Sequence, residues 1–124
     1  MARLPMGELE ATVMEILWDR GGWSTPGEVH DVLAEDRPIA YTTVMTILVR
    51  LWRKGRVDRQ RDGRAFAYQP VRSRDEHAAA RMHDYLVAAG DRPAALSYFV
   101  ASLSTPERVQ LRRIVASQRA KDRP

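Results

Sequence analysis

Hydroxyl and guanidinium side chains line one side of the segment 41–54, and these groups could bind a polyanion. Wound as an α-helix at roughly 100° per residue, the segment gathers its apolar residues on one stripe: Val44, Ile47, Leu48 and Leu51. Nearly opposite lies a set that we call the Thr/Arg face: Thr42, Thr43, Thr46, Val49, Arg50 and Arg53. Short hydroxyls allow close approach, and guanidiniums bond to guanine edges or phosphates, as in a helix laid in the DNA major groove. The alternative is an ordinary solvated face.

The charge distribution favours the DNA interpretation. The net charge is +4, but residues 1–40 carry three Arg against eight Asp and Glu. Residues 41–72 carry eight Arg and Lys against two Asp, and residues 73–124 carry nine against six. Positive charge is therefore concentrated around the Thr/Arg face, which is the electrostatic pattern of a protein that binds a polyanion.

Other classes of function lack the residues that they need. The chain has no cysteine, and its three histidines do not pair with a carboxylate or with each other at a metal-binding spacing. Phosphate-binding glycine loops and nucleophile motifs are also absent from the sequence. We therefore expect that the protein is not an enzyme and that it binds neither a metal ion nor a cofactor. Because the sequence has no apolar run of about 20 residues and no signal peptide, it predicts no membrane insertion and a cytoplasmic location.

The residues before the Thr/Arg face predict two helices that would position it. Apolar residues repeat at helical spacing over residues 8–20, and we expect Glu8, Glu10 and Glu15 to face solvent there. Thr25 and Glu28 form the capping box of a second helix, which has Pro26 at its first position and ends at residues 36–38. The third helix starts directly after Ala40, which is a poor N-cap residue. A short connection between the last two helices predicts a helix-turn-helix.

A hairpin should follow directly. Residues 57–60 and 65–70 alternate as strands do, and the Asp62-Gly63 pair between them is a strong hairpin signal. A hairpin next to such a helix is the wing of a winged helix-turn-helix. Arg61 and Arg64 lie at its tip, where they could reach the DNA backbone or the minor groove; alternatively, they are the charges that exposed tips often carry.

From Ser73 onward the sequence predicts three short amphipathic helices. About 50 residues of this kind bury too little surface to be stable alone, and a second copy of the chain is the simplest partner; folding back on the winged domain is the alternative. The expected architecture is mainly α with a small β-hairpin wing, divided into a DNA-binding domain (1–72) and a helical dimerisation domain (73–124). The expected dimer contacts are Met82, Leu86, Leu96, Phe99, Leu111, Ile114 and Val115.

Several stretches resemble the penicillinase-repressor family (BlaI/MecI/CopY). They are residues 7–10, 13–18, 40–55 and 66–70, and residues 98–100 before Leu103-Ser104. The resemblance covers nearly the whole chain, and its Tyr-Thr-Thr-Val segment (41–44) is quite specific. It implies a homodimeric repressor that binds an inverted repeat of TACA/TGTA half-sites. The implied contact positions are Thr42, Thr43, Thr46 and Arg50 in the helix, with Arg61 and Arg64 in the wing.

Two branches of that family suggest ways to release the repressor. In the antibiotic-sensing branch a regulatory protease pathway cuts the dimerisation domain, and the matching bond is Tyr98–Phe99. The best-known members have Asn where this chain has Tyr98, and for Phe99 itself we favour the interpretation as a core residue. The copper-responsive branch uses cysteines near the C-terminus, which this chain lacks.

The predicted function is therefore sequence-specific repression of transcription. A sequence-neutral architectural DNA-binding protein is the main alternative, but such a protein would not need three Thr facing the groove. A winged helix that binds proteins would not need the excess positive charge of residues 41–72, which we call the basic segment.

Overall fold

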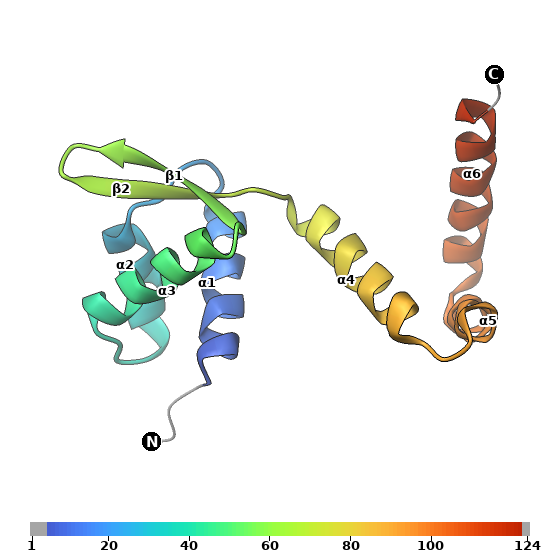
Figure 1. Cartoon of the computed structure of the whole chain (residues 1–124), viewed down its shortest axis with the longest axis horizontal. Coiled ribbons are helices and arrows are strands. Elements are labelled where there is room, and N and C mark those ends of the chain that lie inside the picture. The colour runs from blue at the N-terminus through green and yellow to red at the C-terminus, as the bar shows by residue number, and fades with distance from the viewer. Residues whose placement is uncertain (1–4, 123–124) are drawn as a thin grey trace. The chain divides into compact units, whose positions relative to one another are not determined.

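Six helices and one two-stranded hairpin make up residues 5–122, the part of the chain that the computed structural model describes (Figure 1). Contacts divide the chain into two compact units, one ending at Ala79 and the other beginning at Ala80. The elements are α1 (Met6–Arg20), α2 (Pro26–Asp36), α3 (Tyr41–Arg53), β1 (Val57–Asp62), β2 (Ala65–Pro70), α4 (Arg74–Ala88), α5 (Arg92–Ser102) and α6 (Thr105–Lys121).

The core of the first unit lies between α1, α2, α3 and the hairpin. The predicted apolar stripe of α3 is fully buried, with no exposed surface on Val44, Ile47, Leu48 or Leu51. Residues of the other elements surround it: Val13, Met14, Ile16, Leu17, Val29, Leu33, Val57 and Tyr68. Because this stripe is anchored from three sides, the opposite side of α3 is turned outward.

Local sequence signals set the ends of the helices. Gly21 has a φ of +69° directly after α1, a backbone conformation that favours glycine. The predicted capping box begins α2: the Thr25 hydroxyl accepts a hydrogen bond from the Glu28 amide (3.2 Å), and the Glu28 carboxylate accepts one from the Thr25 amide (2.9 Å). The turn between α2 and α3 is held by His30, whose Nε2 donates to the Ile39 carbonyl at 2.8 Å. His30 therefore has a structural role.

The hairpin is confirmed, with a tighter turn than predicted. Asp62 pairs with Ala65, so only Gly63 and Arg64 form the turn, and Arg61 belongs to β1. Gly63 has a φ of +65°, and positive φ at the first turn residue alone suits a type II′ turn, whose twist matches that of the strands. Ser24 extends the sheet by bridging Tyr68, with both N···O distances 2.8 Å. The wing is thus tied to the core.

The second unit contains the rest of α4, α5 and α6. Side chains cap two of these helices: the Asp91 carboxylate accepts a hydrogen bond from the Ala94 amide at 3.0 Å, and Ser104 and Glu107 form a capping box. No side chain described after Tyr68 is buried. These helices therefore form from strong local signals, but leave their apolar residues in contact with solvent. Among residues 5–122, no helix is both long and apolar enough to cross a membrane.

Candidate nucleic-acid interface

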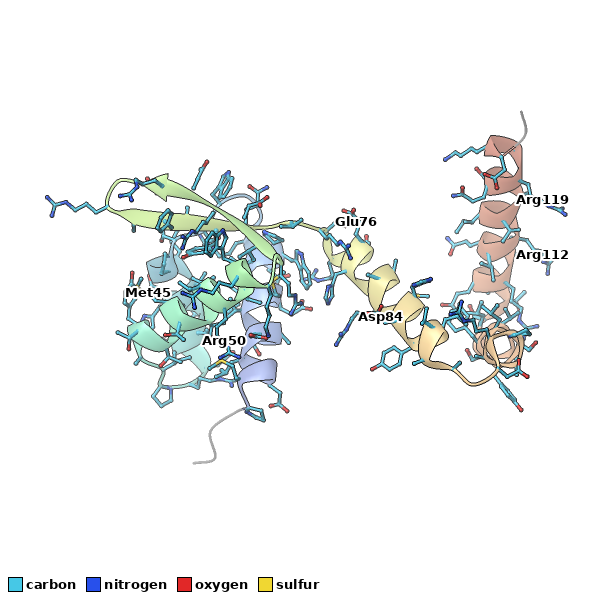
Figure 2. The ribbon with its side chains drawn as sticks, viewed as in Figure 1. Met45, Arg50, Glu76, Asp84, Arg112 and Arg119 are labelled. Atoms are coloured by element: carbon cyan, nitrogen blue, oxygen red, sulfur yellow. The ribbon has the colours of Figure 1, made fainter. Side chains whose placement is uncertain are left out.

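The Thr/Arg face lies on the outside of α3. Thr42, Thr46, Arg50 and Arg53 are exposed, and Thr43 is half-buried. The Thr46 hydroxyl donates to the Thr42 carbonyl at 2.9 Å, which fixes its direction and leaves its oxygen able to accept further bonds. Figure 2 labels Arg50 on this helix. Hydroxyls near one end of the helix and guanidiniums toward the other are therefore presented together on a rigid element.

Glu10 corrects one expectation about α1. It does not face solvent: its side chain is only 6% exposed. The Lys54 ammonium lies 2.8 Å from both carboxylate oxygens, and Arg50 Nε lies 3.5 Å from one of them. The reason is helical spacing, because Glu10, Val13, Met14 and Leu17 share the buried side of α1. A carboxylate from a neighbouring helix thus holds two cations of the basic segment.

This environment changes the acidity of Glu10. Burial by itself raises the pKa of a carboxyl group, but the hydrogen bonds and charges of Lys54 and Arg50 outweigh it. The net result is a pKa for Glu10 below the ordinary value of 4.5. Glu10 is therefore ionised whenever the protein is folded near neutral pH.

Replacing Glu10 by Gln is expected to lower the free energy of unfolding by about 1–2 kcal/mol at neutral pH, because hydrogen bonds to a charged group are lost. The contribution of a carboxyl group with a lowered folded pKa is present above its unfolded pKa and disappears as the pH falls through the folded pKa. The difference between wild type and Glu10→Gln should therefore shrink below about pH 4.5. Urea denaturation across pH measures this, and a difference independent of pH would contradict it.

The wing carries an arginine that sequence reasoning missed. The guanidinium carbon of Arg59 lies 3.5 Å from the ring centre of Trp52 and 4.1 Å from that of Phe66. Arg61 pairs with Phe66 across the hairpin, 5.4 Å from its ring centre, and is exposed. Arg64 is exposed in the turn. The stacked Arg59 connects the wing to α3. Arg59 and Arg61 are two residues apart in β1 and so share one face of the hairpin, and this spacing is the sequence signal that could have identified Arg59.

The first turns of α4 pack onto α1. Trp18 donates its indole N–H to the Arg72 carbonyl at 2.9 Å, and its ring lies 5.3 Å from that of His77. Arg74 bonds to both Glu15 and Asp19 at 2.7 Å. These contacts explain why the first compact unit extends to Ala79. The boundary after residue 72 stays a prediction about independently folding domains.

The expected dimer contacts lie on the surface of the second unit. Met82, Leu96, Phe99, Ile114 and Val115 are exposed, and Leu86 and Leu111 are half-buried. A groove between α5 and α6 has apolar walls and three arginines, and Figure 2 shows two of them, Arg112 and Arg119, on α6. Its lining residues are Val100, Arg108, Leu111, Arg112, Val115, Ala116 and Arg119.

The bond suggested for cleavage lies within α5. Tyr98 is 79% exposed and Phe99 is 44% exposed, so Phe99 is not a core residue of the second unit by itself. In the part of the chain that is described, no group of three or more His, Cys, Asp or Glu is placed to hold a metal ion.

A helix-turn-helix with a basic, hydroxyl-rich second helix, followed by a hairpin, is a winged helix-turn-helix. The sequence profile of the family described as Penicillinase repressor matches residues 6–117. The chain belongs to this family, as its sequence motifs predicted. Members are repressors of transcription and not enzymes, which confirms the expectation that this chain is not an enzyme.

Relatives agree with this assignment. The chain is 45% identical to the transcriptional regulator BlaI of Mycobacterium tuberculosis, over 97% of this chain and 90% of that protein. It is 28% identical to the penicillinase repressor of Bacillus licheniformis, over 69% of this chain and 67% of that protein. The solution structure of the DNA-binding domain of the repressor BlaI aligns with a TM-score of 0.50 and 27% identity, over 61% of this chain and 93% of that one.

Proposed function

We propose that this protein is a sequence-specific repressor that binds, as a homodimer, to an inverted-repeat operator of the TACA/TGTA type. The observation that carries the proposal is the outward Thr/Arg face of α3, which is presented over a fully buried apolar stripe. The names of the relatives support DNA binding and repression. A repressor of this kind acts on the chromosome, in the cytoplasm.

In this proposal α3 lies in the major groove. Thr42, Thr43 and Thr46 allow the helix backbone to approach the base edges, and Arg50 and Arg53 bond to guanine edges or phosphates. Arg61 and Arg64 extend from the wing to the adjacent backbone or minor groove. Steering by the basic segment brings the two molecules together before these contacts form.

The dimer is proposed because the second unit leaves its apolar residues without a covering layer. A two-fold dimer places two recognition helices on two half-sites, so the symmetry of the protein matches that of an inverted repeat. Met82, Leu86, Leu96, Phe99, Leu111, Ile114 and Val115 are the proposed contacts.

Release by cleavage of the Tyr98–Phe99 bond by a regulatory protease belongs to the same proposal. The exposure of both side chains supports access to this bond. The bond lies inside a helix, so α5 must open locally before a protease can bind it in an extended form.

Fluorescence anisotropy with two labelled duplexes tests the proposed function. One duplex carries a TACA/TGTA inverted repeat and the other a scrambled sequence of equal length. A preference of about 10³ or more for the repeat at near-physiological salt is expected of a specific repressor. Equal affinities that fall steeply with salt would instead identify the sequence-neutral architectural alternative.

A further inference from the structure

The contacts of Glu10 give it a position that the proposed DNA contacts do not explain. It lies on α1, whereas both of its partners belong to the end of α3: Arg50 in the last turn and Lys54 at the C-cap. The Lys54 ammonium donates to both carboxylate oxygens of Glu10, at 2.8 Å from each. One buried charge thus contacts two cations at the edge of the Thr/Arg face, Lys54 closely and Arg50 at the outer limit of a hydrogen bond.

The geometry of Arg50 shows what this contact leaves available. A guanidinium has a side edge, which includes Nε, and an end edge formed by its two terminal nitrogens. Glu10 takes the Nε side. Among the residues described, no hydrogen bond joins the terminal nitrogens of Arg50 to the protein. The end edge presents two parallel N–H donors, and these suit two parallel bonds to a guanine or a phosphate.

We propose that Glu10 is a specificity-determining positioning residue, which orients the end edge of Arg50 outward and neutralises Lys54. This inference rests on the proposed function as a DNA-binding repressor. Held by Glu10, Lys54 contributes little attraction to phosphates in general, and Arg50 keeps the fixed direction that selective bonding to a base requires. Glu10 touches no DNA itself; it favours the correct sequence by restraining the cations that do.

The variant Glu10→Gln separates these two effects. It keeps the size of the side chain but removes the charge, so Lys54, which is half-exposed, is free to reach a phosphate. Affinity for the scrambled duplex should rise at low salt. One additional phosphate contact should make the loss of affinity between about 50 and 200 mM salt roughly threefold larger. At the same time the preference for the inverted repeat should fall about tenfold, because Arg50 loses its fixed orientation.

Two further variants make the test specific. Glu8→Gln removes the same charge from an exposed position in the first turn of α1, and it should leave both the preference and the salt dependence close to wild type. In the double variant Glu10→Gln/Lys54→Gln, the salt dependence should return to that of wild type, while the lowered preference remains. Circular dichroism and urea denaturation of each full-length variant establish the folded fraction at the assay pH.

Each outcome decides the proposal. A purely structural role for Glu10 would weaken binding to both duplexes equally, and this would overturn the proposal, as would equal behaviour of Glu10→Gln and Glu8→Gln. If wild type itself does not distinguish the duplexes, the proposed specific repressor fails, and the role of Glu10 in specificity fails with it. The salt dependence on the scrambled duplex still reports separately whether Glu10 restrains Lys54.

Discussion

Replacing Leu111 and Ile114 by Asp is expected to convert the protein into a monomer and to lower its affinity for an inverted-repeat duplex by about 10²-fold or more. Both side chains are apolar positions of α6 in a unit with no buried residue among those described. Two carboxylates placed in a desolvated contact between subunits would have no partners and would oppose association. Once the subunits separate, each half-site is bound independently, and the gain from linking two binding modules is lost.

Sedimentation measures the oligomeric state of this variant, and anisotropy measures its affinity for a full inverted repeat and for a single half-site. Affinity for the single half-site should change little, because the first unit is untouched. The matched control is Arg113→Gln/Ala120→Asp, which makes the same change in net charge at exposed positions on the opposite side of α6 by helical spacing. The control should remain a dimer.

A Leu111→Asp/Ile114→Asp protein that still sediments as a dimer would show that these helices do not join the subunits. A wild-type protein that sediments as a monomer would contradict the dimer directly. It would favour the alternative in which the helices of residues 73–124 are stabilised within one chain.

Features that depend on neighbouring residues in the chain were predictable from the sequence. The apolar stripe of α3 follows from its 3.6-residue period, and all four of its residues are fully buried. The capping box at Thr25 begins α2 where the sequence placed it, and local capping boxes at Ser73 and Ser104 likewise begin α4 and α6. The Asp62-Gly63 pair correctly identified the hairpin. In each case the signal and the structure lie within a few residues of each other.

Contacts between distant residues were not predictable in the same way. Glu10 was expected in solvent, yet its partner Lys54 lies 44 residues away, and only the packing of α1 on α3 brings them together. The position of Arg59 between Trp52 and Phe66 depends on the register of the wing and on its distance from α3. Likewise, the first turns of α4 join the first unit through Trp18 and Arg74, which no local pattern reveals.

In the second unit, the helices were predictable from the sequence but the surface that covers them was not. Its helices were predicted correctly because their caps are local, but the described residues of this unit do not themselves provide a layer that covers its apolar side chains. The apolar spacing of these helices therefore predicts a surface for association, which no local signal assigns to a particular partner.

Replacing Arg50 by Ala is expected to weaken binding to the inverted repeat by about 1–3 kcal/mol if Arg50 bonds to a base or to a desolvated phosphate. The fold should survive the change, because Glu10 keeps both of its 2.8 Å contacts with Lys54 and is not left as an unpaired buried charge. Anisotropy titrations of the inverted repeat and of the scrambled duplex measure the effect. Arg81→Ala, an equal loss of charge at an exposed position of α4, serves as the control and should bind like wild type.

The two duplexes together identify what Arg50 contacts. If it reads a base, affinity for the inverted repeat falls while affinity for the scrambled duplex hardly changes, so the preference decreases. If it contacts a phosphate, both affinities fall together and the dependence on salt decreases by about one counterion. Unchanged affinity for the inverted repeat would remove Arg50 from the interface. Because Glu10 contacts the Nε side of Arg50 and leaves the end edge available for two parallel bonds, we expect the first result.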